Sequence, residues 1–349
     1  MKKEAVKFFT VVVMFFCLVI SAQAGDFKNV VVFGDSLCDS GNVFALKGGT
    51  YPPAPYEGRF SDGPVWVEYL VKTLGIPGAF CNYAHGGAMT GETNTYDDPT
   101  GFTNQVLAYT TFLDAAAGFP TAFPQPKETL FIIWIGANDF LSLSTDVATA
   151  IGNAVTNVYN GMTQLASAGA VTFMVVNLPD LGSTPKMNGD PALATQGVML
   201  AGNFNSALET MLQGFEAAIP AVEIIRLDTF ALLTQIINNP AAYGFTNVTD
   251  KKFDEDAETV AEGNYLFWDE IHPTTMTHKL VAGFAASLLS CSSCAGVPSF
   301  GTTDLALTVP YAELGTAAVG FKLDYCGVDP TVDPDGYYWK LDPLSITVD

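Results

Sequence analysis

Four short segments of the 349-residue chain combine residue types that together could carry out nucleophilic catalysis. The first is Gly34-Asp35-Ser36-Leu37, which directly follows the apolar run at residues 30–33. Three of the four residues in that run are β-branched, so it predicts a buried strand that ends just before Ser36. A Ser at the carboxyl edge of an α/β sheet is a candidate nucleophile if a base and an oxyanion site reach it. The alternative is that Ser36 only caps the following helix.

Two further segments could hold an oxyanion. Residues 82–88 place Gly86 and Gly87 directly after a predicted strand, and a Gly lets a backbone N–H approach a ligand closely. Asn138 follows the apolar run at residues 130–135, and its side-chain amide can donate to a developing negative charge. Each segment also has a plain structural interpretation, which is a tight turn for the two glycines and a helix cap for Asn138.

The fourth segment, at residues 268–273, supplies a candidate base. Among the three His of the chain, His272 has a carboxylate, Asp269, three residues before it on a predicted turn. This spacing lets Asp269 accept the ring Nδ1–H and leaves Nε2 to face a nucleophile, which is the arrangement of a catalytic triad. His85 is a rival base, but the backbone turns there and no carboxylate is adjacent. His278 falls within the last predicted helix, where we expect it to be solvated.

The elements that must position these segments alternate between strands and helices. We predict strands at residues 29–33, 80–84, 130–135, 171–176 and 222–227. We predict helices from a start signal at Asp62 and Pro64 to Leu74, and at residues 101–117, 147–168, 195–218, 229–237 and 273–289, the last with Pro273 in its first turn. Residues 250–258 read as an acidic surface loop. This βαβ series predicts a three-layer α/β/α fold with a five-stranded parallel sheet covered on both faces.

Composition divides the chain into three predicted parts. Residues 1–24 carry three Lys, an apolar run at 8–20 and a small-x-small ending, which is typical of a secretory signal cleaved after Ala24. The run is too short for a membrane anchor, and Cys17 lacks a lipid-attachment context. Residues 25–294 form the predicted α/β domain. Residues 295–349 lack a helical pattern and predict a small β-rich C-terminal appendage. We therefore expect a secreted or periplasmic protein without a stable membrane span.

The charge of the chain limits its partners. The formal net charge is −21, and removing the three Lys and one Glu of the signal makes it −23. This charge argues against a nucleic-acid partner and against electrostatic docking on anionic lipid, although an ester of a lipid could still enter an apolar cleft.

Five cysteines lie outside the signal, namely Cys38, Cys81, Cys291, Cys294 and Cys326. An exported protein can hold disulfides, but an odd number leaves one thiol over and the pairing does not follow from sequence. A bridge between Cys38 and Cys81 is one hypothesis. Cys291 and Cys294 have the spacing of half a zinc site, but neither a second pair nor a nearby His completes it.

Taken together, and in their order along the chain, the four segments resemble the GDSL esterase/lipase family, also called SGNH hydrolases, over residues 29–289. The resemblance implies a flavodoxin-like α/β fold and an activity that needs no cofactor and no metal. It implies roles for five residues: catalytic Ser36, Asp269 and His272, and an oxyanion hole made by the N–H groups of Ser36 and Gly87 and the side chain of Asn138.

Other residues narrow the resemblance. Residues 55–66 resemble a segment of the lysophospholipase A and glycerophospholipid–cholesterol acyltransferase branch, which plant GDSL lipases share, and residues 177–182 and 243–245 are similar to that branch too. Cys38 departs from the pattern, because relatives often have a small polar residue there. Gly86 is an alternative to Gly87 as the oxyanion donor, and we favour Gly87.

The resemblance implies an exported serine esterase or lipase that forms an acyl-enzyme on Ser36. The favoured substrate is an acyl lipid, above all a lysophospholipid, and acyl transfer to an alcohol would use the same acyl-enzyme. One alternative is a carbohydrate O-acetyl esterase, which predicts a pocket too short for long acyl chains. Another is a secreted binding protein without catalysis. Protein partners, oligomeric state and the role of residues 295–349 do not follow from the sequence.

Overall fold

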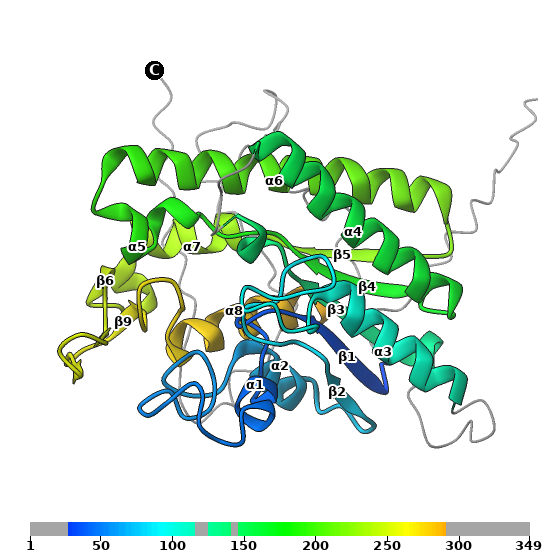
Figure 1. Ribbon diagram of the computed structural model, residues 1–349, viewed down its shortest axis with the longest axis horizontal. Helices are drawn as coiled ribbons and strands as arrows, with labels where there is room; N and C mark the ends of the chain where they lie inside the picture. Colours follow the sequence, from blue (N-terminus) through cyan, green and yellow to red (C-terminus); the bar gives the residue numbers. More distant parts are fainter. Residues whose placement is uncertain (1–26, 116–124, 141–145, 291–349) are drawn as a thin grey trace, which may run out of the picture.

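Five parallel strands form the central sheet of the computed structural model, which describes residues 27–115, 125–140 and 146–290 (Figure 1). The strands are β1 (Asn29–Gly34), β2 (Phe80–Asn82), β3 (Thr129–Trp134), β4 (Thr172–Val176) and β5 (Glu223–Leu227), in the order β2-β1-β3-β4-β5. This is the flavodoxin-like order, in which the chain changes direction across the sheet between β1 and β3. The predicted fold class is thereby confirmed for the α/β domain.

Helices cover both faces of the sheet, because its strands are apolar on both sides. One layer contains α3 (Phe102–Ala115), α4 (Val147–Ser167) and α6 (Pro191–Ala218), and the other contains α2 (Trp66–Leu74), α7 (Thr229–Asn238) and α8 (Thr275–Ser290). Alternation along β1 divides its side chains between two cores: Val31 and Phe33 pack toward α3, α4 and α6, while Val30 and Val32 pack toward the other layer. The two cores fix β1 and therefore the turn that follows it.

Two predicted helix starts, at Pro273 and at Asp62 and Pro64, differ from the observed ones. Helix α8 begins at Thr275, and Pro273 instead forms a β-bridge with Phe267. Asp62, predicted to start its own helix, accepts the N–H of Thr275 at 2.7 Å and so caps α8. Helix α2 begins after Val65, whose N–H is accepted by the carboxylate of Glu68 at 2.9 Å. The start signals are real, but one of them serves a helix more than two hundred residues away.

The region between α7 and α8 contains short strands where the sequence predicted only an acidic loop at 250–258. These are β6 (Asn247–Lys251), β7 (Phe253–Asp254), β8 (Thr259–Val260) and β9 (Tyr265–Phe267). Strands β7 and β8 form an antiparallel hairpin, and β6 pairs with β9 in parallel. Two short helices, α1 (Asn42–Leu46) and α5 (Pro185–Asn188), and the early start of α6 at Pro191 after the capping side chain of Asp190, complete the fold.

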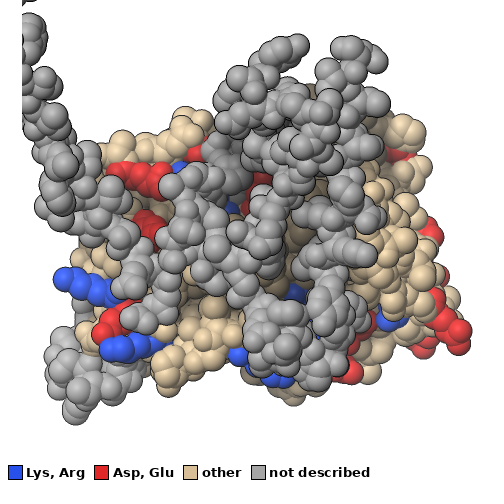
Figure 2. Space-filling model, turned by 180° about the vertical axis from the view of Figure 1, so that it is seen from behind, with Lys and Arg blue, Asp and Glu red and all other residues tan. Residues whose placement is uncertain are grey.

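Several predictions fall outside the described residues, namely the signal at 1–24, the appendage at 295–349 and the cysteines at 291, 294 and 326. Among the described helices, none is long and apolar enough to cross a membrane. On the visible part of the face shown in Figure 2, Lys and Arg side chains are scattered among Asp, Glu and wide uncharged areas.

The hypothesis of a Cys38–Cys81 bridge is wrong, because both thiols are free. Cys38 is buried, and its sulfur accepts the indole N–H of Trp66 at 3.3 Å. The thiol therefore fills a core position between the turn after β1 and helix α2. Burial raises the pKa of Cys38 well above its ordinary value, so the thiol stays protonated.

Candidate active site

Ser36 lies in the turn after β1, beside the point where β1 and β3 end together. Gly34 pairs with Trp134, and a Cβ added at Gly34 would come within 2.6 Å of the Trp134 carbonyl oxygen. Only a glycine therefore lets the two strands end this close to each other. This edge, at the change of direction between β1 and β3, is where flavodoxin-like folds bind ligands.

A glutamine from helix α3 holds the end of β1. The N–H of Gly34 donates to Gln105 Oε1 at 2.9 Å, and Gln105 Nε2 donates to the Gly34 carbonyl at 2.8 Å. One buried side chain thus satisfies both backbone groups of the residue two positions before Ser36. Gln105 was not identified from the sequence, because nothing local connects it with a strand 71 residues away.

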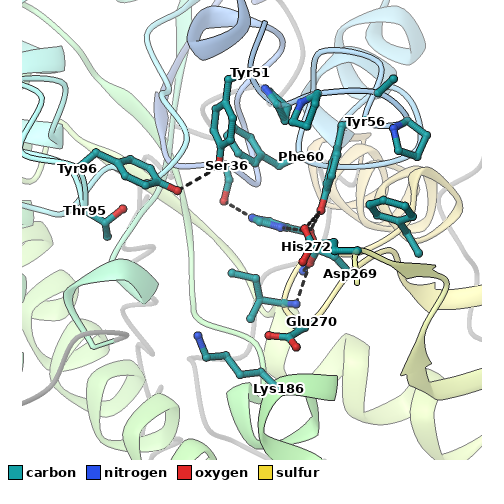
Figure 3. A pocket seen from close by; sticks show the side chains of 18 of the residues that line it. Ser36, Tyr51, Tyr56, Phe60, Thr95, Tyr96, Lys186, Asp269, Glu270 and His272 are labelled. Carbon is teal, nitrogen blue, oxygen red and sulfur yellow. Dashed lines mark hydrogen bonds and ion pairs between the residues drawn. The ribbon is translucent and has the colours of Figure 1, made fainter. Parts of the chain in front are cut away.

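The structure brings Ser36, His272 and Asp269 into one hydrogen-bonded chain (Figure 3). His272 Nε2 lies 2.9 Å from Ser36 Oγ, and His272 Nδ1 lies 2.7 Å from Asp269 Oδ2. The other oxygen of Asp269 accepts the N–H groups of Ile271 at 2.9 Å and His272 at 2.7 Å. The turn from 269 to 272 therefore fixes the carboxylate against its own backbone and aims the outer ring nitrogen at Ser36.

Charge and burial have opposite effects on the pKa values of His272 and Asp269. Burial favours the neutral imidazole, but the carboxylate of Asp269 and, next, that of Asp35 outweigh it and raise the pKa of His272 above its ordinary value. Burial would also raise the pKa of Asp269, but the charge and hydrogen bond of His272 and two backbone N–H groups hold it below its ordinary value. The pair therefore favours a carboxylate beside an imidazolium, the state that forms when His272 takes a proton.

Asp35 is a third carboxyl group at the site. It is buried, its Oδ1 accepts the N–H of Leu37 at 3.0 Å, and burial raises its pKa to about 7. It therefore carries only part of its charge near neutral pH.

The three predicted oxyanion donors also converge on the site. Gly86 is excluded as a donor because its N–H is taken by Asp39 Oδ2 at 2.9 Å. Within the described ranges, no hydrogen bond occupies the N–H of Gly87 or of Ser36. Gly87 has φ of 78°, and a Cβ there would come within 2.7 Å of Thr95 Oγ1, so the position requires glycine.

Asn138 lies in the short 3-10 helix Ala137–Asp139, directly after β3, and lines the cleft beside Ser36. Its Nδ2 donates to the carbonyl of Ala88 at 3.0 Å, which holds the amide and leaves a second N–H to point at a ligand. The residue is buried and lines the cleft together with Ser36, Gly87 and His272. This hydrogen bond to Ala88, the residue after Gly87, thus ties the side chain of Asn138 to the turn that holds Gly87.

The two other histidines take no part in this hydrogen-bonded chain. His85 is half-buried, and its Nδ1 contacts the carbonyl of Tyr83 at 2.9 Å. The prediction of a solvated His278 is wrong: its side chain is fully buried, and neither ring nitrogen has a partner in the described part of the chain. Burial, followed by the charge of His272, lowers the pKa of His278 to about 3. It is a neutral core residue of α8.

Ser36 and His272 open into a cleft of about 940 Å³. Its walls are rich in aromatic rings and carboxylates, with one lysine, as Figure 3 shows. The aromatic residues are Tyr51, Tyr56, Phe60, Tyr96 and Phe253; the charged ones are Lys186, Glu255, Glu258, Asp269 and Glu270. Ser36 and His272 also border a smaller hollow of about 60 Å³, whose exposed lining surface is mostly apolar and includes Trp134, Leu181 and Leu233.

Five polar residues that support the site were not identified as such from the sequence. They are Asp35, Asp39, Tyr56, Gln105 and Glu255. Asp39 offers a partial signal, since an Asp close before a helix can accept its free N–H groups, and its carboxylate does accept the N–H of Asn42 at 2.6 Å. Asp35 acts locally, on the N–H of Leu37, whereas Tyr56, Gln105 and Glu255 act across long stretches of chain, for which a single sequence gives no signal.

The fold and this geometry define a class of protein: an α/β enzyme whose Ser, His and Asp side chains meet beside N–H donors at the carboxyl edge of a parallel sheet. The model of the GDSL-like lipase/acylhydrolase family matches residues 30–283. The chain belongs to this family, as the four segments indicated, and is a carboxylic ester hydrolase.

Two relatives match over much of their length. The thermolabile hemolysin of Vibrio parahaemolyticus is 30% identical over 279 residues, which span 74% of this chain and 63% of the hemolysin. The phosphatidylcholine-sterol acyltransferase of Aeromonas hydrophila is 27% identical over 338 residues, 79% of this chain and 96% of the acyltransferase. Among solved structures, a catalytic mutant of an acetylxylan esterase from Geobacillus stearothermophilus has a TM-score of 0.43 at 14% identity, covering 76% of this chain and 96% of that one.

Proposed function

We propose that the protein is a serine esterase that hydrolyses acyl lipids, most of all lysophospholipids, at Ser36. The observation that carries the proposal is the 2.9 Å contact between Ser36 Oγ and His272 Nε2, with Asp269 behind the ring at 2.7 Å. A hydroxyl at this distance from an oriented imidazole can lose its proton as it attacks a carbonyl.

In the first half of the proposed reaction, Ser36 Oγ attacks the ester carbonyl and His272 Nε2 takes the hydroxyl proton. Asp269 keeps Nδ1 protonated and stabilises the imidazolium. The carbonyl oxygen becomes an oxyanion and accepts hydrogen bonds from the N–H groups of Ser36 and Gly87 and from the Asn138 amide. Collapse breaks the ester bond, His272 returns its proton to the leaving alcohol, and the acyl group stays on Ser36.

In the second half, water attacks the acyl-enzyme. His272 takes a proton from the water, the same three donors hold the oxyanion, and the fatty acid leaves as the proton returns to Ser36 Oγ. An alcohol in place of water would give acyl transfer by the same steps. Which of the two dominates depends on how well the cleft excludes water from the acyl-enzyme.

The lining of the large cleft supports a phospholipid substrate. Aromatic faces beside carboxylates attract a quaternary ammonium group, and the cleft holds three tyrosines and two phenylalanines beside several acidic side chains. Lys186, in the same cleft, can pair with a phosphate. A volume of about 940 Å³ lies at the upper end of what ligand sites offer, so a headgroup and glycerol fit within it.

The likeness to the phosphatidylcholine-sterol acyltransferase of Aeromonas hydrophila, which covers 96% of that protein, agrees with this substrate class. Our proposal extends to the ends of the chain: residues 1–24 direct export and are removed, residues 25–294 form the hydrolase domain, and residues 295–349 form a separate β-rich appendage. The protein would then act in the periplasm or outside the cell.

The test is the rate of hydrolysis against acyl length, from acetyl to palmitoyl esters, with lysophosphatidylcholine included and Ser36→Ala as the blank. Rates that persist or rise with long chains support the proposal. Activity confined to acetate would replace it with carbohydrate deacetylation, and equal activity in Ser36→Ala would remove the mechanism altogether. Failure of folded protein to react with a fluorophosphonate would favour a binding protein.

A further inference from the structure

The carboxylate of Asp269 accepts four hydrogen bonds, and one of them comes from a side chain outside the Ser–His–Asp chain. The hydroxyl of Tyr56 donates to Asp269 Oδ2 at 3.0 Å, the same oxygen that accepts His272 Nδ1 at 2.7 Å (Figure 3). With the two backbone N–H groups on Oδ1, all four lone-pair positions of the carboxylate are used. Tyr56 therefore completes the support of the residue that orients the base.

The ring of Tyr56 is held in an aromatic cluster. It is 5% exposed and meets Phe253 edge-on at a centroid distance of 5.6 Å and Trp268 at 5.9 Å. Phe253 and Trp268 stack on each other at 5.3 Å. Because Trp268 directly precedes Asp269, this cluster fixes the phenol hydroxyl relative to the carboxylate.

A second carboxylate competes for the same hydroxyl. Glu255 Oε1 lies 2.5 Å from the Tyr56 oxygen, on the exposed turn of the β7–β8 hairpin. A phenol has one proton, so Tyr56 can donate to Asp269 or to an ionised Glu255, but not fully to both. The N–H of Phe253 donates to the Trp268 carbonyl at 2.7 Å, which anchors this hairpin beside the site.

We propose that Tyr56 is a positioning residue for the Asp269–His272 pair and that Glu255 competes with Asp269 for its proton. The hairpin at 253–260 thereby tunes the base. When Tyr56 donates to Asp269, the carboxylate is held and part of its charge is satisfied. When Tyr56 donates to Glu255, its lone pair faces Asp269 and the support is lost. The role rests on the proposed hydrolysis at Ser36.

The charged surroundings set the direction of each effect. Asp269, Asp35 and Glu255 all raise the pKa of His272, and the neutral His278 lies near enough to feel its charge. The remaining charged groups that line the cleft are Lys186, Glu258 and Glu270. Removing the negative charge of Glu255 therefore favours neutral His272, whereas removing a donor from Asp269 strengthens the attraction of that carboxylate for the His272 proton.

The test measures kcat and kcat/KM against pH with a short, soluble p-nitrophenyl ester. In Tyr56→Phe the ring stays but the donor is lost, so kcat on the plateau falls about tenfold, the value of one hydrogen bond to a charged group. The acid limb also moves to higher pH. In Glu255→Gln the amide can donate to the phenol oxygen and direct the Tyr56 proton to Asp269. Its plateau kcat then equals or exceeds wild type, and its acid limb moves to lower pH.

Two matched controls separate this role from packing and from general charge. Asp256→Asn removes one charge from the same hairpin, and Tyr109→Phe removes a buried hydroxyl that has no partner among the described residues. Both should keep the wild-type profile. A wild-type plateau and acid limb in Tyr56→Phe would overturn the proposal, as would Asp256→Asn moving the limb as far as Glu255→Gln.

If Tyr56→Phe does not fold, the exposed variants Glu255→Gln and Asp256→Asn decide the outcome between them. Ser36→Ala separates the two proposals. Hydrolysis that survives Ser36→Ala overturns the proposed function itself. Hydrolysis that needs Ser36 but is unaffected by Tyr56→Phe overturns only the role of Tyr56 and Glu255.

Discussion

The two halves of the site are held in different ways. Ser36 and Asn138 follow β1 and β3, two adjacent, fully buried strands, and Gln105 clamps the end of β1 with two hydrogen bonds. Asp269 and His272 instead follow the three-residue strand β9 and depend on side chains from Tyr56 and an exposed hairpin. The proposed nucleophile and oxyanion donors are therefore held by the sheet, whereas the proposed base is held by a hydrogen-bond network that runs from buried Asp269 and Tyr56 to the exposed Glu255.

This difference suggests where the enzyme can be tuned. Parallel strands with two buried faces change little without loss of the core. A network that shares one proton between two carboxylates responds to a single charge or a single donor. The base half is thus the adjustable half, and variants in the two halves should fail in different ways.

The largest effect is expected in the base half. Asp269→Asn replaces the acceptor of Nδ1–H by an amide, which favours the wrong tautomer of His272 and lowers kcat on the order of 10⁴-fold. The fold is expected to survive, so the measurement is kcat on a short ester beside a thermal unfolding curve. A loss of less than tenfold in a folded protein would show that Asp269 does not orient the base.

In the nucleophile half, Asn138→Ala removes one oxyanion donor and should lower kcat by about 10² to 10³-fold. KM should change little, because the donor acts on charge that develops in the transition state. Steady-state kinetics across substrate concentration separate the two parameters. A rise in KM with unchanged kcat would assign Asn138 to ground-state binding instead.

The clamp on β1 predicts a loss of stability that the base half should not show. Gln105→Leu leaves the buried N–H of Gly34 without a partner, while the Gly34 carbonyl keeps the N–H of His85 at 3.1 Å. We expect the free energy of unfolding to fall by about 1–3 kcal/mol. Urea unfolding measures the change. Glu255→Gln, in the base half, should stay within about 0.5 kcal/mol of wild type. Equal losses in both variants would contradict the contrast between a rigid half and an adjustable half.

What can be predicted from the sequence depends on whether the contact joins residues close together in the chain. Uninterrupted apolar runs predict β3 and β4, because a parallel strand buried on both faces needs no polar positions. The Asp269–His272 spacing is local too, and the structure brings these residues to Ser36 as expected. The hydrogen bond between Tyr56 and Glu255 joins residues 199 apart, and no periodicity reports such a pair.

The burial of His278 could have been predicted from the apolar pattern of the last helix. It lies three and four residues before Val281 and Ala282, on the same helical face as Ala285, and all of these are buried. The apolar stripe of α8 thus includes position 278. A polar residue type was given more weight than its place in the pattern.

His278 supplies the smallest prediction. Its pKa is about 3 in the folded protein and about 6.5 when unfolded, so the unfolded state binds an extra proton between these values. The free energy of unfolding should therefore fall as pH drops below about 6.5, by about 1.4 kcal/mol per pH unit from this residue. Asp35, whose pKa of about 7 is raised, acts in the opposite direction over part of that range.

The quantity to measure is the difference in unfolding free energy between His278→Leu and wild type from pH 7 to pH 4. It should grow as pH falls, because the variant lacks the group that must charge on unfolding. Val281→Ala, at a buried position of the same helix that carries no titratable group, is the control, and its difference from wild type should stay flat. A constant difference for His278→Leu would show that His278 takes up its proton in the folded state as readily as in the unfolded state.

The measurement that tests the central claim most directly is the rate at which a fluorophosphonate labels the folded protein, followed against pH, with the modified peptide identified by mass. We expect label on Ser36, at a rate that rises with pH through a midpoint above about 6.5, because the raised pKa of His272 delays formation of the neutral base. His272→Ala should nearly abolish labelling. Label on another residue, or equal labelling of Ser36 without His272, would contradict the account.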